Sequence, residues 1–377
     1  MKTRPSAKGH GRAAARSFTM VELLVVMSVI MILLGIGVSV YFGLLRVNAM
    51  QSEKYAVVAI IQSARSTARA ESSETFVCIE PETGRIYPFG REKVGVWHFE
   101  TLEDSPSRTY GALGHAALVT GGEAKLTDGK VNKALLFDGT YHLRCKMLRG
   151  AQWVEIPAYD THEGVAIEAS VAPVHSGADD MTIMSRDGWF GMSLRYDETS
   201  KKFALVAFAV VLDADEAGYL KHSASTAPVI RPNEWTHVSM SCHKLSTGIT
   251  LTINGVEQDL AGSGSEAIPA PLSDTETAIG AAAGGAEYFY GRIDHLIISA
   301  YVVDTVHQVS QKLALEAEGL ADGNTIRFGP SGELTAEHEG TPPRVLLKEY
   351  KGGNVVSSSV TITVGPMGAL DVETWNK

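Results

Sequence analysis

The sequence has little cysteine, more acidic than basic residues, and none of the common catalytic signatures. Its three cysteines, Cys78, Cys145 and Cys242, show no C-x-x-C spacing and are too few for a disulfide scaffold, so at most one bridge can form within a chain. A formal net charge of −10 argues against a nucleic-acid partner, because such binding relies on basic patches. No H-E-x-x-H, G-x-x-x-x-G-K-[ST] or G-x-S-x-G segment occurs. The chain therefore lacks the sequence marks of metallopeptidases, P-loop proteins and serine hydrolases.

Acidic residues are also missing from residues 1–17, which carry five basic ones, and charge of either sign is missing from Leu23 to Leu45. At ~1.5 Å per residue, this apolar run is long enough to cross a ~30 Å hydrocarbon core. Glu22 stands just before the run, where a carboxylate costs on the order of 2.5–3.5 kcal/mol unless it is paired. Because basic residues stay on the cytoplasmic side, we expect a single-pass protein whose C-terminal part is exported.

No A-x-A-like cleavage site follows the apolar run, so it does not read as a cleaved signal peptide. The segment Ser17-Phe18-Thr19-Met20-Val21-Glu22-Leu23-Leu24 resembles the processing signature of the type IV pilin and pseudopilin family. The resemblance implies that a prepilin peptidase removes residues 1–17 and that Phe18 is N-methylated. It also implies that Glu22 meets the N-terminal amine of a neighbouring subunit during assembly. Ser17 departs from the family, in which Gly usually precedes the cut. The alternative interpretation is an ordinary signal anchor in which Glu22 is a stray acid.

Beyond the apolar run, the spacing of small and apolar residues predicts an amphipathic helix that lies on a small sheet; the positions are Val57, Ile61, Ala64 and Ala68. Residues 75–80 predict a strand that ends at the turn Pro81-Glu82-Thr83-Gly84. The run from Ala64 to Glu80 resembles the start of the H-type pseudopilins and fimbrial minor pilins, whose helix also ends in an Ala-Arg-Ser stretch before the first strand.

The end of the chain, Ala321 to Lys377, resembles the closing strands of the same pseudopilins. There a Phe-x-Pro-x-Gly strand precedes a Thr-Val-x-Pro-x-Gly end, and this sequence has Phe328-Gly329-Pro330-Ser331-Gly332 and Thr363-Val364-Gly365-Pro366-Met367-Gly368. The last strand before that end should place Val360, Ile362 and Val364 on one face.

Between these two parts, short strand-like runs alternate with turns rich in Gly, Pro, Asn and Asp. Residues 249–253 alternate cleanly and end at Asn254-Gly255, a strong hairpin signal. Such spacing suggests an all-β sandwich. In sequence order, the phrases VGVWHFE, GKVNKALLFDG, WVEIP, IEASVAP, EWTHVSMSC, LTINGV, TAIGAA and YGRIDHLIIS resemble the laminin-G-like (concanavalin A-like) jelly roll.

Together, these features predict an α+β protein: a long N-terminal transmembrane and amphipathic helix with a small antiparallel pilin sheet, and an all-β jelly roll inserted in it. Insertion is favoured because the termini of a domain often lie close together. A tandem arrangement, with the tail as an extra edge hairpin, is the alternative. The expected parts are a leader (1–17), the pilin helix and first strands (18–93, transmembrane about 20–45), the jelly roll (94–304), a connecting helix or linker (305–319) and the closing pilin strands (320–377).

The jelly-roll resemblance also bears on chemistry. Its glycan-cleaving members carry Glu-x-Asp-x-x-Glu, which is absent here, so we expect no enzyme activity. No cofactor is expected beyond a structural calcium ion, for which the resemblance implies Glu100 and Asp294. Trp189 and Tyr219 are expected as exposed aromatic platforms for a glycan or protein ligand.

The predicted function is that of a minor pilin or pseudopilin of a type II secretion or type IV pilus-like fibre, which displays a carbohydrate- or protein-binding module. Its partners would be the prepilin peptidase, other pilin subunits, the inner membrane and a glycan or surface protein, without nucleic acid. The N-terminus would be cytoplasmic and the C-terminal domains periplasmic or extracellular. The alternative is a membrane-anchored, lectin-like surface protein that does not assemble; only the first hypothesis requires Glu22.

Overall fold

The computed structural model describes residues 20–104, 107–149, 152–156, 162–213, 218–272, 275–321, 324–338, 340–351 and 355–376. The chain forms two units, Met1–Ala56 and Val57–Lys377. One helix, α1 (Met20–Glu71), begins in the first unit and ends in the second.

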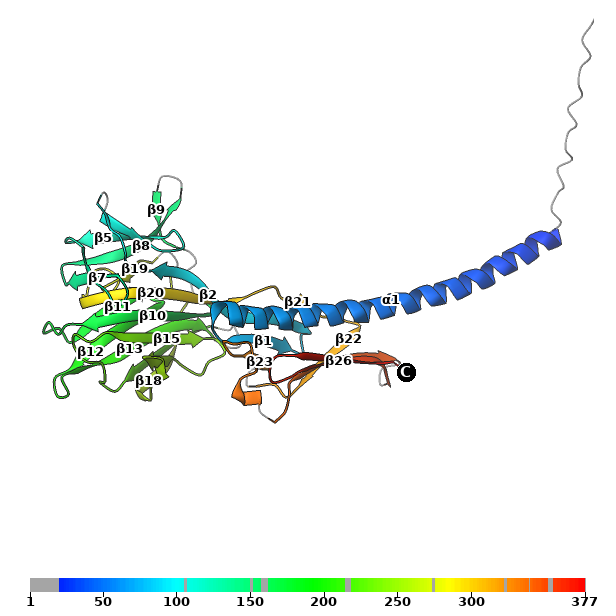
Figure 1. Cartoon of the computed structure of the whole chain (residues 1–377). Helices are drawn as coiled ribbons and strands as arrows, with labels where there is room; N and C mark the ends of the chain where they lie inside the picture. Colours follow the sequence, from blue (N-terminus) through cyan, green and yellow to red (C-terminus); the bar gives the residue numbers. More distant parts are fainter. Residues whose placement is uncertain are drawn as a thin grey trace, which may run out of the picture. The chain divides into compact units, whose positions relative to one another are not determined.

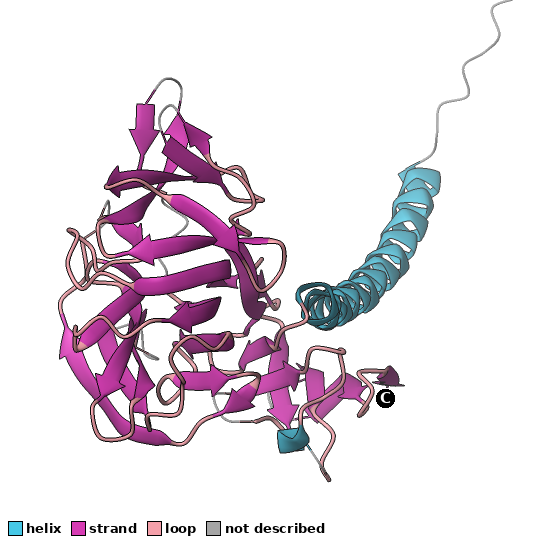
Figure 2. Ribbon diagram, turned by 60° about the vertical axis from the view of Figure 1, so that its left-hand side comes forward, coloured by secondary structure: helices cyan, strands magenta, loops and turns pink. Residues whose placement is uncertain are grey.

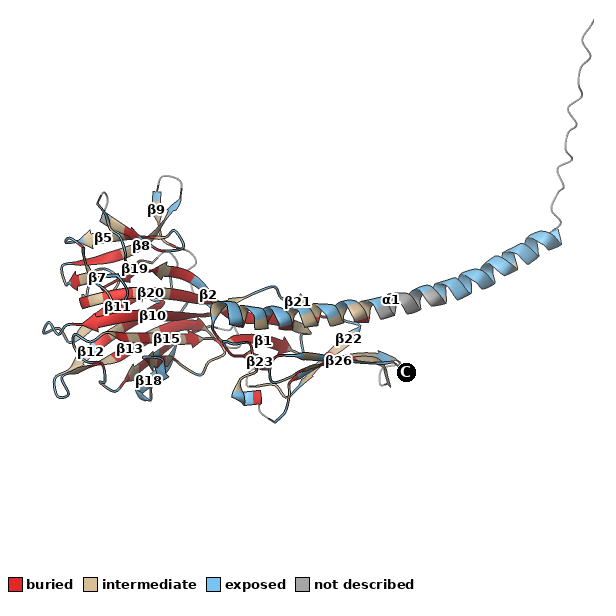
Figure 3. Cartoon of the chain, in the orientation of Figure 1, coloured by how far each residue is buried: buried red, intermediate tan, exposed pale blue. Residues whose placement is uncertain are grey.

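The first unit contains the apolar part of α1. Met20–Val38 has a mean hydropathy of 2.7 and is long and apolar enough to cross a membrane, as a single span or a signal anchor would be. Its side chains are exposed to the surroundings (Figure 3). Glu22 lies in the first turn of the helix and is exposed. Ser17 and Phe18 lie outside the described residues.

The second unit contains two large sheets. The first sheet consists of β1 (Thr75–Glu80), β2 (Arg85–Trp97), β6 (Lys125–Asp128), β7 (Lys133–Asp138), β10 (Gly164–Pro173), β15 (Thr236–His243), β16 (Thr250–Ile253), β17 (Val256–Glu257), β20 (Tyr290–Val303), β21 (His307–Gln308) and β23 (Thr325–Phe328). Its main order is β17-β16-β15-β10-β20-β2-β1-β23; β7 pairs with β20, β6 with β7, and β21 with β2.

The second sheet consists of β3 (Glu103–Asp104), β4 (Ser107–Tyr110), β5 (Ala116–Gly121), β8 (Tyr141–Arg149), β9 (Gln152–Val154), β11 (Asp180–Arg186), β12 (Phe190–Asp197), β13 (Lys202–Leu212), β14 (Tyr219–Thr226), β18 (Leu260–Ile268) and β19 (Thr277–Ile279). Its main order is β18-β14-β13-β12-β11-β19-β8-β5-β4-β3, and β9 pairs with β8. A smaller third sheet has the order β22-β24-β25-β26, with β22 (Leu313–Glu318), β24 (Arg344–Lys351), β25 (Val355–Val364) and β26 (Leu370–Asn376). A short 3-10 helix, η2, covers Ala336–His338.

The two large sheets form a β-sandwich with one hydrophobic core (Figures 2 and 3). Alternation along the strands places one face inside: in β15, every second residue is buried. Trp97, Phe137, Ile167, Leu205 and Ile298 are among the side chains that meet in this core. Removing such apolar surfaces from water is the main source of the stability of the sandwich.

The strand predicted before the jelly roll is confirmed, since β1 spans Thr75–Glu80. It forms an antiparallel hairpin with β2 in the register Thr75↔Gly90 to Glu80↔Arg85. On its other edge, β1 pairs with β23 from the C-terminal part of the chain, in the register Thr75↔Phe328 to Cys78↔Thr325.

The second-unit part of α1 lies along β1, β2 and β23 (Figures 1 and 2). Its predicted apolar stripe is buried: Val57, Ile61, Ala64 and Ala68 are at most 1% exposed. The strands bury their own apolar residues in turn, including Val77, Ile79 and Ile326. A helix that hides one stripe on a sheet accounts for this pattern.

Two glycine turns of the C-terminal part hold the helix through arginine side chains. Arg65 donates from Nε to the carbonyl of Gly332 at 3.1 Å and from Nη2 to the carbonyl of Met367 at 2.6 Å. Arg69 donates from Nε to the carbonyl of Ser331 at 2.8 Å. Gly332 and Gly368 have φ of 78° and 71°, and a Cβ on either would come within 2.6 Å of an arginine Nε. Glycine therefore serves both the turn and the close approach. We call this set of contacts the arginine clasp.

Two expectations about the connections differ from the structure. The predicted connecting helix at 305–319 is wrong, because this segment contains β21 and β22. β22 is needed as an edge partner of β24, with which it pairs from Leu313↔Glu349 to Glu318↔Arg344. The expected boundary between 93 and 94 does not fall in a loop either, since β2 runs continuously from Arg85 to Trp97.

The alternation predicted for the final strand is confirmed within β25, where Val360, Ile362 and Val364 are buried. This strand belongs to the third sheet and pairs with β24 and β26. Of the strands in the C-terminal part, β23 is the one that joins β1 among the described residues.

The arginine clasp predicts a stability effect. Arg65→Met keeps the apolar stem but removes two charge-assisted hydrogen bonds to carbonyls, which should lower the free energy of unfolding by about 2 kcal/mol. Urea unfolding of the full chain in detergent measures this. Arg231→Met is the matched control, because Arg231 forms only an exposed pair with Glu234 at 3.4 Å. Equal unfolding midpoints for the two variants would show that the clasp does not stabilise the fold.

Candidate functional site

At one end of the sandwich, two of the residues predicted to bind a ligand lie together with a histidine. Trp189 sits in the turn between β11 and β12, and Tyr219 begins β14. The ring of His162 lies 4.7 Å from that of Trp189, edge to face, and its Nδ1 is 2.9 Å from the Tyr219 hydroxyl. The ring centroids of Trp189 and Tyr219 are 6.2 Å apart.

The prediction that Trp189 is an exposed platform is wrong, because its side chain is 1% exposed. Its indole Nε1 donates to the carbonyl of Leu272 at 2.8 Å, as a buried indole usually requires a partner. Tyr219 is half-buried, and its hydroxyl is engaged by His162. A ligand role for Tyr219 stays a prediction. Nothing near His162 in the sequence indicated this contact, since only the fold brings the residue to β11 and β14.

The two residues expected to hold calcium both contact one loop. Asp294 is 1% exposed, and its Oδ2 accepts the backbone N–H groups of Lys130 and Val131, each at 3.0 Å. Glu100 Oε1 accepts from Asn132 Nδ2 at 3.3 Å. Two N–H donors aimed at one carboxylate oxygen suit a loop cap and not a cation ligand. The described residues contain no group of three or more His, Cys, Asp or Glu side chains arranged for a metal ion. Calcium stays a prediction that these contacts do not support.

A strained histidine pair lies next to this loop. His98 and His295 approach with their Nδ1 atoms 3.0 Å apart, so one ring must donate to the other. His295 and the neighbour of His98, Phe99, have φ of 50° and 54°, which is unusual for residues other than glycine and asparagine. The register of β20 against β10 shifts at this point, which marks a β-bulge. Burial and then the charge of His98 lower the pKa of His295, so the pair favours its less charged form.

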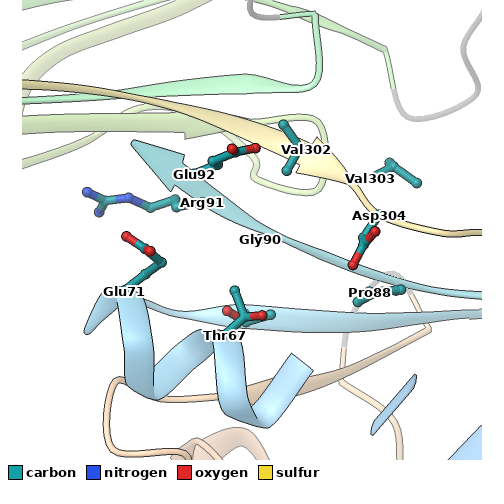
Figure 4. Close-up of a pocket in the computed structure, with 10 residues that line it drawn as sticks. Thr67, Glu71, Pro88, Gly90, Arg91, Glu92, Val302, Val303 and Asp304 are labelled. Carbon is teal, nitrogen blue, oxygen red and sulfur yellow. The ribbon is translucent and has the colours of Figure 1, made fainter. Parts of the chain in front are cut away.

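A cleft of about 360 Å³ lies where the end of α1 meets β1, β2 and β20 (Figure 4). Gly90 forms part of its lining, and a Cβ there would come 3.0 Å from Thr75 Cγ2. Glu71, Glu92 and Asp304 outnumber Arg91 in the lining and make it acidic. Arg91 also pairs with Glu168, and Glu71 pairs with Lys93 at 3.1 Å. Such a lining disfavours anions. The cleft lies where the helix-covered hairpin joins the sandwich.

A second cluster joins the β1–β2 hairpin to the sandwich on the face of the first sheet that carries Phe76. We call it the joint cluster; its buried members are Phe76, Cys78, Tyr87, Phe89, Ala166 and Tyr301. His243 contacts the rings of Phe76, Phe89 and Tyr301, with centroids 4.7–5.7 Å away. Lys244 is 8% exposed, pairs with Glu163 at 2.7 Å and lies over the rings of Tyr87 and Phe89. The cluster therefore holds the hairpin against strands β10, β15 and β20.

The cysteines contribute no cross-link. Cys78, Cys145 and Cys242 all lie within the described residues and are buried free thiols. Burial raises the pKa of Cys78 and of Cys242 to about 12, so both stay protonated at neutral pH. They act as small apolar side chains in their clusters.

Comparison with known proteins gives a family match for part of the sandwich. Residues 148–306 match the family model described as the concanavalin A-like lectin/glucanases superfamily. This part of the chain is a concanavalin A-like jelly-roll domain, as expected from its phrases. No curated protein matches the chain.

Two solved structures illustrate the likeness. Domain 4 of AbnA, a GH43 extracellular arabinanase from Geobacillus stearothermophilus in complex with arabinotriose, is 18% identical, covers 56% of this chain and 93% of its own, and has a TM-score of 0.40. The CBM40 of the Ruminococcus gnavus IT-sialidase, bound to α2,3-sialyllactose, is 14% identical, covers 48% of this chain and 90% of its own, and has a TM-score of 0.29.

The joint cluster predicts a loss of stability in acid. Burial among aromatic rings, and then the charge of Arg327, lower the pKa of His243 to about 4 from its ordinary value near 6.5. Below pH 6.5 the unfolded chain therefore binds more protons at His243 than the folded chain does. The free energy of unfolding is highest above pH 6.5 in this respect and falls as the pH drops towards 4. At about 1.4 kcal/mol per pH unit, the loss is on the order of 2 kcal/mol.

The measurement is thermal unfolding between pH 7.5 and pH 4.5 for the wild type and His243→Phe. Several other histidines titrate with the same sign, so the difference between the two proteins isolates His243. The variant should lose less stability on acidification. Parallel stability curves would contradict a buried neutral His243.

Proposed function

We propose that this protein is a membrane-inserted subunit of a pilin- or pseudopilin-type fibre that carries a carbohydrate-binding jelly roll inserted in its pilin domain. The observation that carries the proposal is the return of the chain to the helix. After the jelly roll, β23 pairs with β1, and the arginine clasp fastens the turns at Gly332 and Gly368 to Arg65 and Arg69.

This arrangement supports an insertion over a tandem order. In a tandem order, the tail would contact only the jelly roll. Here the two glycine turns, whose Phe-x-Pro-x-Gly and Thr-Val-x-Pro-x-Gly sequences resemble the closing strands of pseudopilins, are the ones that meet Arg65 of the Ala-Arg-Ser stretch. The proposed pilin domain therefore comprises residues 18–93 and about 320–377, with the jelly roll between them.

In the proposed mechanism, the prepilin peptidase of the inner membrane removes residues 1–17 and leaves Phe18 as the methylated N-terminus. The apolar helix then leaves the bilayer and packs against neighbouring subunits. Glu22 pairs there with the terminal amine of a neighbour, a contact that fixes register more than it adds stability. A jelly roll on each subunit would crowd a fibre surface, which favours a minor subunit over a major one.

We further propose that the jelly roll binds a carbohydrate and does not cleave it. Its family is described by lectins and glucanases, and the two solved structures above contain bound sugars by their own descriptions. The Glu-x-Asp-x-x-Glu signature is absent from the sequence. A protein ligand is the alternative, as is a membrane-anchored lectin that never assembles.

Replacement of Glu22 separates assembly from simple anchoring. Glu22→Ala should lower the amount of protein in sheared surface material at least tenfold while membrane levels stay unchanged, because the register contact is lost. Immunoblots of the two fractions measure this. Glu53→Ala is the matched control, since Glu53 lies on the same helix beyond the apolar run. If the amount of the Glu22 variant in sheared surface material equals that of the wild type, the result would favour the non-assembling lectin.

Mass spectrometry of the N-terminus tests processing. Protein from sheared material should begin at a methylated Phe18, since the proposed peptidase cuts after Ser17 despite the missing Gly. The membrane fraction serves as the internal comparison. An intact Met1 terminus confined to membranes would leave a signal anchor and remove the fibre proposal.

A further inference from the structure

The open edge of the sandwich holds a polar cleft of about 470 Å³. It lies between the edge strands of the two sheets, β16 and β17 on one side and β14 and β18 on the other, together with the turn after β15. Figure 1 labels β18, the edge strand of the second sheet. The cleft is distinct from the cluster of Trp189 and Tyr219 and from the cleft at the end of α1.

Hydroxyl groups occupy positions where a sandwich normally places apolar side chains. In β18, Ser263 and Ser265 pair directly with Ala224 and His222 of β14, so all four share one face. Ala224 belongs to the hydrophobic core, which makes this the inner face. Both serines are nevertheless exposed. The two sheets are therefore open at this edge instead of being sealed by a core.

The lining of the cleft is close to neutral and rich in groups that both donate and accept hydrogen bonds. Besides Ser263 and Ser265 it includes Thr247, Thr250 and His222, with Glu257 as its one carboxylate among the described residues. Ser246 also lines the cleft, but its hydroxyl is used within its own turn, where it donates to the His243 carbonyl at 2.6 Å. The hydroxyls of Ser263, Ser265 and Thr247 make no hydrogen bond to another described residue.

His222 adds a polar ring to the lining of the cleft. The residue is 5% exposed and lines the cleft, and its side chain forms no hydrogen bond with another described residue. Burial lowers its pKa, against an opposing effect of Asp213, so the ring is neutral near pH 7. Its ring nitrogens are not among the buried side-chain atoms that lack a hydrogen-bond partner, so they reach the cleft, where a ligand hydroxyl can pair with them.

We propose that this cleft is the sugar-binding site of the jelly roll and that it takes a neutral oligosaccharide, whose hydroxyls pair with Ser263, Ser265, Thr247, Thr250 and neutral His222. The inference rests on the carbohydrate function proposed above and adds its site and ligand class. Sugar hydroxyls both donate and accept, as these side chains do. Leu260, which is 38% exposed, offers the apolar contact that the carbon face of a sugar ring needs.

A peptide is the other occupant to consider, because β18 has an unpaired edge among the described strands. Strand addition gains specificity from pockets for alternate side chains. From Ala261 to Ser265, β18 carries only Ala, Gly and Ser, which are too small to shape pockets for alternate side chains. An acidic glycan is disfavoured by Glu257, since nothing cationic lines the cleft among the described residues.

The test uses the full chain in detergent and a panel of cellotetraose, maltotetraose, xylotetraose and N-acetylchitotetraose, with binding followed by ligand-observed NMR. For the oligosaccharide that binds the wild type, the double variant Ser263→Ala/Ser265→Ala should bind at least tenfold more weakly. Ser225→Ala is the matched control, because Ser225 pairs with Gly262 on the same strand pair but lies outside the cleft lining. Thermal unfolding checks that all variants fold, which we expect because both replaced serines are exposed.

The outcomes separate the two proposals. If the double variant binds the oligosaccharide as the wild type does, the cleft is not the site. The same holds if Tyr219→Ala abolishes binding and the double variant does not. In both cases the carbohydrate function stands. Wild-type binding to none of the four oligosaccharides overturns the neutral-glycan site together with the carbohydrate function as stated here. A tenfold loss in the double variant with full binding by Ser225→Ala supports both.

Discussion

The second unit of the structure depends on the contact between Arg65 and two glycine turns from the far end of the chain. One guanidinium satisfies the carbonyls of Gly332 and Met367, and Gly368 passes so close to it that no side chain fits there. Backbone carbonyls in tight turns need hydrogen-bond donors. The arginine side chains on one face of α1 supply these donors, so no neighbouring strand is needed. The two turns follow Arg65 by 267 and 302 residues, so these hydrogen bonds join the start and the end of the second unit.

Strand β2 is the second constraint. It pairs with β1 at its start and with β20 of the sandwich along the rest of its length, so the helix-covered hairpin and the jelly roll share one continuous strand. The joint cluster around His243 and Lys244 closes the same junction from the other face. A load applied to the jelly roll would therefore pass through sheet hydrogen bonds to the strands under α1 instead of through a linker.

Local patterns were sufficient for the elements that depend on their own sequence. The strand at Thr75–Glu80, the buried stripe at Val57, Ile61, Ala64 and Ala68, and the alternation of Val360, Ile362 and Val364 follow from periodicity and turn residues. The segment 305–319 was misread because its strands exist only through partners, β2 for β21 and β24 for β22. Trp189 was misread as exposed for the same reason, since the Leu272 carbonyl and the His162 ring that enclose it lie elsewhere in the chain. The roles proposed for Ser263 and His222 had no sequence signal, because only the register of β18 against β14 places these side chains on one face.

The order of the first sheet also shows how far the proposed sugar site lies from the strands under α1. β16 and β17 border the polar cleft at one edge of this sheet, and β1 and β23 lie under the helix at the other. With neighbouring strands about 4.8 Å apart, the five steps from β16 to β1 separate the two by roughly 24 Å. A ligand in the cleft therefore does not meet the arginine clasp, so binding need not disturb the contacts that hold the chain to its helix. The joint cluster lies nearer, because Ser246 lines the cleft and donates to the carbonyl of His243 at 2.6 Å. Side chains at the cleft edge of this sheet can therefore change without altering the opposite edge, where the glycine turns contact the arginines of α1.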